Sequence, residues 1–136
     1  DVKIAPQDLR RGRTYPSIDK KIQTSWSAMM IKSLFKLGAI DSKYKQRAIK
    51  SLSKLLKTMY IDDHLYHSTL IHKTPKVKAF LEDYAFLASA LLEGYKQTKD
   101  EVYLIDAQKY ANKALKDFYK NGQWLFSYKE FEVVAE

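Results

Sequence analysis

Two carboxylates, Asp19 and Asp83, stand at the start of apolar, helix-forming segments and close to aromatic residues. Paired carboxylates can act as general acid and general base on a sugar-like substrate, and aromatic rings can stack on it. We therefore predict Asp19 and Asp83 as catalytic residues. The side chains predicted to bind a substrate around them are Arg13, Lys20, Trp26, Glu82 and Tyr84.

The same residues also have a structural interpretation. Acidic side chains at a helix start interact with its positive end and accept hydrogen bonds from its free N–H groups. Asp19 and Asp83 could therefore be helix caps, and Trp26 and Tyr84 could belong to the core. A cavity that gathers these side chains would favour catalysis, whereas burial or dispersal would favour the structural role.

Three histidines, His64, His67 and His72, fall around the first predicted strand. Their spacings of 3 and 5 residues do not converge on one metal ion, so we predict no metal site and no cofactor. A histidine that acts as a general base at a cavity rim is the better functional hypothesis, because imidazole titrates near neutral pH. An ordinary polar loop, with His67 as a packing position, is the structural alternative.

Basic residues dominate the first half of the chain, and the net charge is +8. Arg10, Arg11 and Arg13 precede Pro16 and the first helix, where they could hold an anionic group or form a solvated linker. Most other cations are lysines scattered over outer helix positions, and no binding module is recognisable. We therefore predict no nucleic-acid partner.

The composition is typical of a folded, helix-rich protein: 136 residues, 46% hydrophobic, 29% charged, with only 4 glycines and 3 prolines. The absence of cysteine excludes disulfides, thiolate zinc sites and cysteine nucleophiles, and it fits a cytoplasmic protein. No apolar run approaches the roughly 20 residues that cross a bilayer, so no membrane partner is predicted.

A repeat with a constant offset organises the chain, since Asp41, Ala48 and Leu55 correspond to Asp100, Ala107 and Ala114. Apolar positions at steps of 3 and 4 predict amphipathic outer helices over about 42–60 and 101–120. More apolar inner helices are predicted over about 20–37 and 81–97. Strands are predicted over 65–70 and 124–128.

The whole chain, 1–136, is predicted to be a fragment of a larger helical domain, with one unit at about 19–74 and a second at about 79–130. The inner helix 81–97 is apolar almost all round, and stacked repeats normally need three or more copies to cover their buried faces. We therefore expect the remainder of a parent chain, or a second chain, to cover the inner helices.

The segments 11–27, 80–87 and 95–100 resemble the C-terminal toroid of thioredoxin-domain-containing proteins of the YyaL and spermatogenesis-associated protein 20 type. The sequence departs from that family at Ser27 and Ala28, where the family has Asn and Gly, and at Ile18, where it has a second Asp. The thioredoxin domain is absent, so no redox activity carries over.

The resemblance implies an all-α fold, helical hairpins of an (α/α)6 toroid with short strands between units, related to sugar epimerases and glycosidases. The leading hypothesis is therefore part of a carbohydrate-active, six-hairpin enzyme with a sugar-like substrate and an unproven reaction. The alternative is a non-catalytic helical scaffold or partner-binding module, because a fold does not fix a function.

Overall fold

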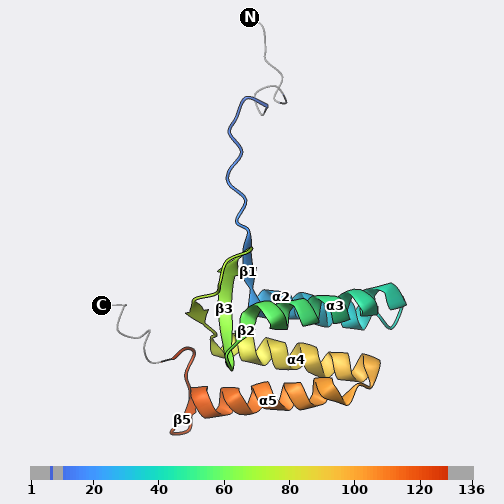
Figure 1. Ribbon diagram of the computed structural model, residues 1–136, viewed down its shortest axis with the longest axis vertical. Helices are drawn as coiled ribbons and strands as arrows, with labels where there is room; N and C mark the ends of the chain where they lie inside the picture. Colours follow the sequence, from blue (N-terminus) through green and yellow to red (C-terminus); the bar gives the residue numbers. More distant parts are fainter. Residues whose placement is uncertain (1–6, 8–10, 129–136) are drawn as a thin grey trace, which may run out of the picture.

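The computed structural model describes Gln7 and residues 11–128. The helices α2 (Thr24–Leu37), α3 (Ser42–Met59), α4 (Leu81–Thr98) and α5 (Glu101–Phe118) lie side by side, and the short strands gather at one end of them (Figure 1). The amino ends of the inner helices α2 and α4 lie at this strand end. The elements in chain order are β1 (Lys21–Gln23), α2 (Thr24–Leu37), α3 (Ser42–Met59), β2 (Tyr60–Ile61), β3 (His64–Leu70), β4 (Val77–Lys78), α4 (Leu81–Thr98), α5 (Glu101–Phe118), β5 (Tyr119–Lys120) and β6 (Gln123–Trp124).

The predicted repeat is confirmed at the level of its elements. The outer helices α3 and α5 each have 18 residues, and their first residues, Ser42 and Glu101, occupy corresponding positions of the repeat. Each helix begins after an aspartate cap: Asp41 accepts the N–H of Lys43 at 3.0 Å, and Asp100 accepts that of Val102 at 3.0 Å. The turns that follow the two helices also match, because both contain residues with positive φ: Asp62, Asp63, Asn121 and Gly122.

The first inner helix differs from its prediction, because it begins at Thr24 and not near residue 20. Residues Lys21–Gln23 form β1 instead, paired antiparallel with β3, so that Lys21 lies opposite Leu70. The backbone N–H and C=O groups of these residues find their hydrogen-bond partners on β3, in place of the partners that a helix would supply. Asp19 and Lys20 therefore precede a strand and do not lie on the first turn of a helix.

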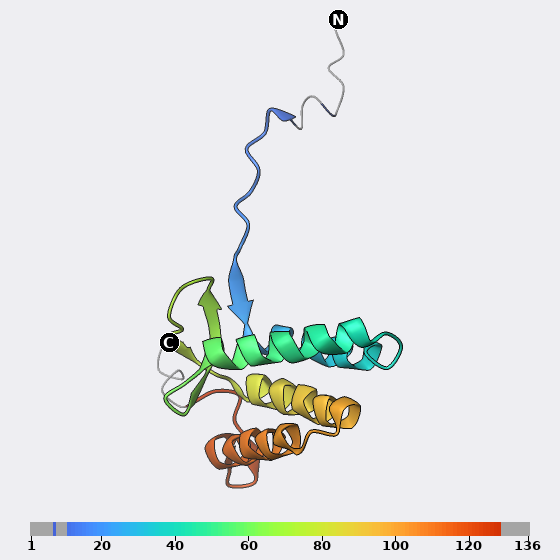
Figure 2. The ribbon, with the colours of Figure 1, turned by 45° about the vertical axis from the view of Figure 1, so that its right-hand side comes forward.

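The strands form one sheet in the order β1-β3-β2, with β4 also paired to β3, and a separate β5–β6 hairpin. The predicted strand 65–70 is confirmed as part of β3. The predicted strand 124–128 is wrong beyond Trp124, because only Gln123 and Trp124 pair with β5. In the turned view β1 and β3 run side by side in opposite directions at this end of the helices (Figure 2).

One hydrophobic core joins the helices, and α2 packs against both α3 and α4. Phe35 and Gly94 occupy corresponding positions of the two inner helices, and they touch each other. A Cβ on Gly94 would lie 3.0 Å from the Phe35 ring. The absent side chain thus makes room for the ring, and α2 and α4 approach closely.

Large apolar side chains remain at the surface of both helical hairpins. Met30 on α2 and Ile105 on α5 are more than half exposed, and Leu92 on α4 is nearly so, whereas Leu87 and Leu91 are fully buried. The sequence predicted that α4 is buried on all sides, but within this chain it is buried on only part of its surface. Among the described residues, no helix combines the length and the hydrophobicity needed to cross a membrane.

Candidate functional site

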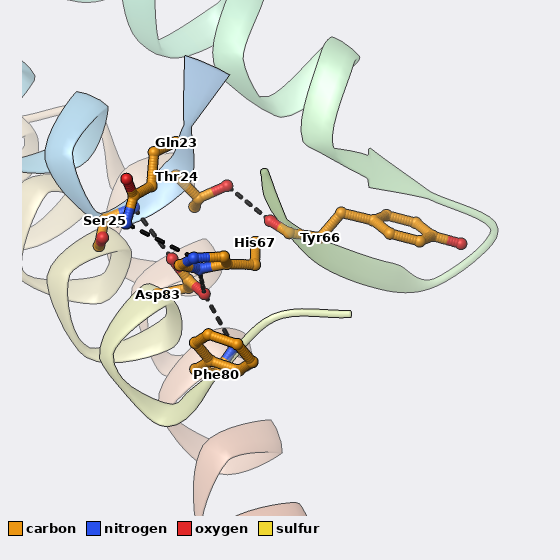
Figure 3. Close-up of polar contacts among 7 residues, drawn as sticks. All are labelled: Gln23, Thr24, Ser25, Tyr66, His67, Phe80 and Asp83. Carbon is orange, nitrogen blue, oxygen red and sulfur yellow. Dashed lines mark hydrogen bonds and ion pairs between the residues drawn. The ribbon is translucent and has the colours of Figure 1, made fainter. Parts of the chain in front are cut away.

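Asp83 lies in the first turn of α4, fully buried, and links the starts of both inner helices (Figure 3). One carboxylate oxygen, Oδ2, accepts the N–H of Phe80, the N-cap residue of α4, at 2.8 Å. The other, Oδ1, accepts the N–H of Ser25 in the first turn of α2 at 3.0 Å. Helix starts leave such N–H groups without partners, so Asp83 caps both helices.

His67, on β3, is the third partner of Asp83. Its Nδ1 lies 2.8 Å from Asp83 Oδ2, and its ring stacks on Phe80 with 4.2 Å between ring centroids. Its Nε2 lies 3.5 Å from the side-chain amide nitrogen of Gln23. Because an ionised carboxylate only accepts hydrogen bonds, this contact favours the tautomer with the hydrogen on Nδ1 and the lone pair on Nε2. The side chain of His67 is 15% exposed.

The strand β3 positions His67 through contacts with the chain around α2. Gln23, at the end of β1, lies opposite Ser68 in the antiparallel pairing. The hydroxyl of Thr24 donates to the carbonyl oxygen of Tyr66 at 2.6 Å. These contacts fix the residues on either side of His67, so the orientation of its ring is set by both neighbouring elements and by the carboxylate.

Burial raises the pKa of the Asp83 carboxyl group above its ordinary value. The hydrogen bonds from Phe80, His67 and Ser25 oppose that rise, because they stabilise the ionised form. A carboxylate with this many donors can hold an imidazole in one tautomer. Such a pair is the usual arrangement of a histidine that transfers protons.

A metal centre fits this cluster less well. Ligand atoms of His67, Glu82 and Asp83 lie within 4.8 Å of one another. Both oxygens of Asp83, however, already accept backbone N–H groups. A cation at Asp83 would have to displace hydrogen bonds that cap the inner helices, so the chemistry of the donors suits a hydrogen-bonded pair better.

A cavity of about 730 Å³ lies between α2 and α3, beside β1. Trp26 lines it and is 67% exposed, and Met30, Ile31 and Leu55 give it apolar walls. Its polar lining comprises Asp19, Lys21, Gln23, Ser27, Ser51, Lys54 and Thr58. An accessible indole beside hydroxyl and charged groups is the chemistry of a site for a polar ring-shaped ligand.

The two predicted catalytic carboxylates lie in different surroundings. Asp19 is exposed, accepts the Lys21 N–H at 3.1 Å, and lines the cavity with Trp26. Asp83 is buried beside His67, and neither of these two residues lines this cavity. Gln23 connects the two places, because it lines the cavity and contacts His67.

The other predicted binding residues are dispersed. Glu82 is half-buried beside Asp83, whereas Arg13 and Lys20 are exposed on the segment before β1. Tyr84 is 1% exposed and packs against Tyr110 and Phe118. A substrate cannot stack on Tyr84 in this chain, because other rings already cover it.

The sequence pattern did not indicate Gln23 or Ser25. It offered one unspecified histidine as a base at a cavity rim, and it named His67 only as a packing position. The available signal was an aspartate at the third position of a helix after an aromatic N-cap residue, since such an aspartate accepts the N-cap N–H. That signal predicts the Phe80 contact. It contains nothing about His67 or Ser25, which come from other elements.

Solved structures with a similar fold were found for this chain. The chain matches a GH76 alpha-mannanase of Bacteroides thetaiotaomicron with a TM-score of 0.69 and 23% identity over 79% of this chain and 31% of that one. It matches the cellobiose 2-epimerase of Spirochaeta thermophila with a TM-score of 0.69 and 14% identity over 82% of this chain and 29% of that one. The chain therefore has the fold of helical hairpins from an (α/α)6 toroid.

Two curated relatives extend the comparison to sequence. The chain is 28% identical over 137 aligned residues, 94% of its length, to the uncharacterized protein B0495.5 of Caenorhabditis elegans. It is 26% identical over 109 residues, 70% of its length, to human spermatogenesis-associated protein 20. No protein-family profile matches. The resemblance to the toroid region of the spermatogenesis-associated protein 20 type is confirmed.

The chain spans a small part of these relatives: 19% of the Caenorhabditis elegans protein and 14% of the human one. The alignments therefore concern one stretch of each relative, and the activity of a whole protein does not follow from them.

Proposed function

We propose that the chain contributes to a carbohydrate-active site in which His67, held by Asp83, transfers a proton to or from a sugar. One observation carries the proposal: His67 Nδ1 lies 2.8 Å from a fully buried carboxylate. This leaves Nε2 as the basic atom, on the side of the residues that lead to the cavity. The matched structures are those of a mannanase and an epimerase, which supports a sugar as the substrate.

The proposed role of each residue follows from how exposed its side chain is. His67 moves the proton, and Asp83 positions the ring and stabilises its charged form. Gln23 contacts Nε2 and lines the cavity, so it positions His67 towards a ligand. Trp26 is the accessible ring on which a sugar can stack, and Asp19 lies at the same cavity as a second acid–base group.

The experiment incubates the chain with a panel of mono- and disaccharides in D2O and follows each sugar by NMR. Loss of a carbon-bound proton signal by exchange with deuterium indicates proton abstraction, as in epimerisation, whereas release of a smaller sugar without this exchange indicates hydrolysis. We expect one of these changes for at least one sugar. The variant His67→Asn should abolish it, because Asn can still donate to Asp83 but has no basic nitrogen.

His72 offers a matched control. It is exposed and has a φ of 62°, a conformation that asparagine tolerates. His72→Asn should therefore leave both folding and activity unchanged. Turnover that persists in His67→Asn would exclude His67 as the proton-transferring group.

A non-catalytic scaffold is the second candidate function, and one observation favours it. Asp83 is fully buried, and its contacts with Phe80 and Ser25 are explained by capping alone. If no sugar is turned over or bound, and His67→Asn changes only the stability, the scaffold interpretation replaces the catalytic one.

A further inference from the structure

The outer helix α3 carries a row of positive charge that the proposed proton transfer does not use. The five cations Lys43, Arg47, Lys50, Lys54 and Lys57 follow one another at steps of 4, 3, 4 and 3 residues. These steps place them on one helix face, and all five are exposed. At about 1.5 Å per residue the row is roughly 21 Å long. We call these five residues the basic row.

The internal repeat shows that the fold does not require this charge. The positions of α5 that correspond to the basic row hold Val102, Asp106, Lys109, Lys113 and Lys116, with a net charge of +2 against +5 (3 − 1 against 5 − 0). Both helices have the same length and the same type of cap. The helix α3 contains no acidic residue, and within the described chain Lys43 makes the row's one ion pair, with Asp41.

The basic row meets the cavity at Lys54, which belongs to both. Lys21 adds a second ammonium group to the lining, partly compensated by Asp19 at 3.7 Å. Hydroxyl groups of Ser51 and Thr58 lie on the same helix. The cavity thus offers an indole face, hydroxyl groups and ammonium groups together.

We infer that this surface binds an anionic saccharide chain, with one sugar on Trp26 and its acidic neighbours along the basic row. The inference rests on the proposed function, because it names the substrate class at the same cavity. Lysine ammonium groups bind carboxylate or sulfate as point charges without fixed geometry, which suits a flexible chain. A single-stranded nucleic acid would need several stacking rings, and Trp26 is the one aromatic residue in the lining that the structure describes.

The test measures binding of three ligands by calorimetry and tryptophan fluorescence: an oligogalacturonate, a neutral oligosaccharide of equal length, and a single-stranded oligonucleotide of equal charge. We expect the oligogalacturonate to bind at least tenfold more tightly than either of the others. Its affinity should fall severalfold as the salt concentration rises from about 50 to about 200 mM, because exposed charges are screened.

The repeat supplies matched variants. The triple change K50Q/K54Q/K57Q should weaken binding at least tenfold, whereas K109Q/K113Q/K116Q, at corresponding positions of α5, should weaken it less than twofold. Trp26→Ala should remove the fluorescence change. Melting curves check that each variant folds. If a variant does not fold, the salt dependence of binding to the unaltered chain still tests the inference.

The outcomes separate the inference from the proposed function. Equal binding of the neutral and acidic saccharides would overturn the inference and leave the proposed function standing. Tighter binding of the oligonucleotide, or equal effects of the two triple variants, would also overturn it. Binding of no saccharide at all would count against both.

Discussion

Asp83, in the first turn of α4, accepts the backbone N–H of Ser25, in the first turn of α2, at 3.0 Å. One buried carboxylate therefore joins the starts of the two inner helices. Along the chain these helices are separated by α3 and by the strands β2 to β4. It also holds His67, so structural and proposed chemical roles meet in one side chain. Substitutions can separate these roles.

Asp83→Ala should lower the free energy of unfolding by about 2 to 4 kcal/mol, because two N–H groups at helix starts lose their acceptor. Asp83→Asn should lower it less, since its carbonyl oxygen can still accept one of them. Urea denaturation of the two variants beside the unaltered chain measures both. A stability within about 0.5 kcal/mol of wild type for Asp83→Ala would contradict the capping role.

Gly94→Ala places a methyl group 3.0 Å from the Phe35 ring, and crowding of this kind costs about 1 to 3 kcal/mol. Alanine gains roughly 1 kcal/mol over glycine in a helix, so we expect a net destabilisation of up to about 2 kcal/mol. Phe35→Leu in the same chain should remove part of the clash, and thermal denaturation of the single and double variants measures the coupling. Strictly additive effects would show that the two residues do not touch.

Burial raises the pKa of the Tyr110 phenol well above its ordinary value of 10.0. The unfolded chain ionises above pH 10 while the folded chain keeps its proton, so stability is present below pH 10 and falls as the pH rises above it. Tyr110→Phe should therefore lose about 1.4 kcal/mol less stability than wild type between pH 8 and pH 11. Equal losses in urea denaturation at the two pH values would contradict the burial of this hydroxyl group.

The chain alone should associate or bind a hydrophobic dye. Phe86, Leu92 and Ile105 are exposed outside the cavity, and covering a large apolar side chain contributes about 1.5 to 3 kcal/mol. Analytical ultracentrifugation measures the association. A monomer with a sharp cooperative melt and no dye binding would contradict the expectation that further chain covers these helices.

Local sequence signals predicted the outer helices and their repeat, because an aspartate cap and an apolar stripe act within a few residues. Asp41 and Asp100 cap their helices as predicted. The strand β1 was not predictable in this way. Its residues form a strand because they pair with β3, which follows α2 and α3 in the chain, whereas their own composition continues the helical pattern of α2.

In the candidate site, too, local features were predictable from the sequence and contacts between distant segments were not. The sequence indicated Asp83 as an acid at a helix start. It suggested that one of the three histidines acts as a base, and it named His67 only as a packing position. It could not show that Asp83 and His67 meet, because their contact depends on the register of β3 and on where α4 begins. Likewise, the burial of Tyr84 depends on Phe118, which belongs to another helix.

The tautomer of His67 decides whether Asp83 holds this histidine in the form that transfers a proton. Long-range nitrogen–proton NMR spectra at pH 8, with His67→Asn used for assignment, distinguish a hydrogen on Nδ1 from one on Nε2. We predict the Nδ1–H tautomer, and a shift of the Nε2 resonance when a saccharide that binds the chain is added. An Nε2–H tautomer, or an Nε2 signal that no saccharide of the panel changes, would contradict a proton-transferring His67 held by Asp83.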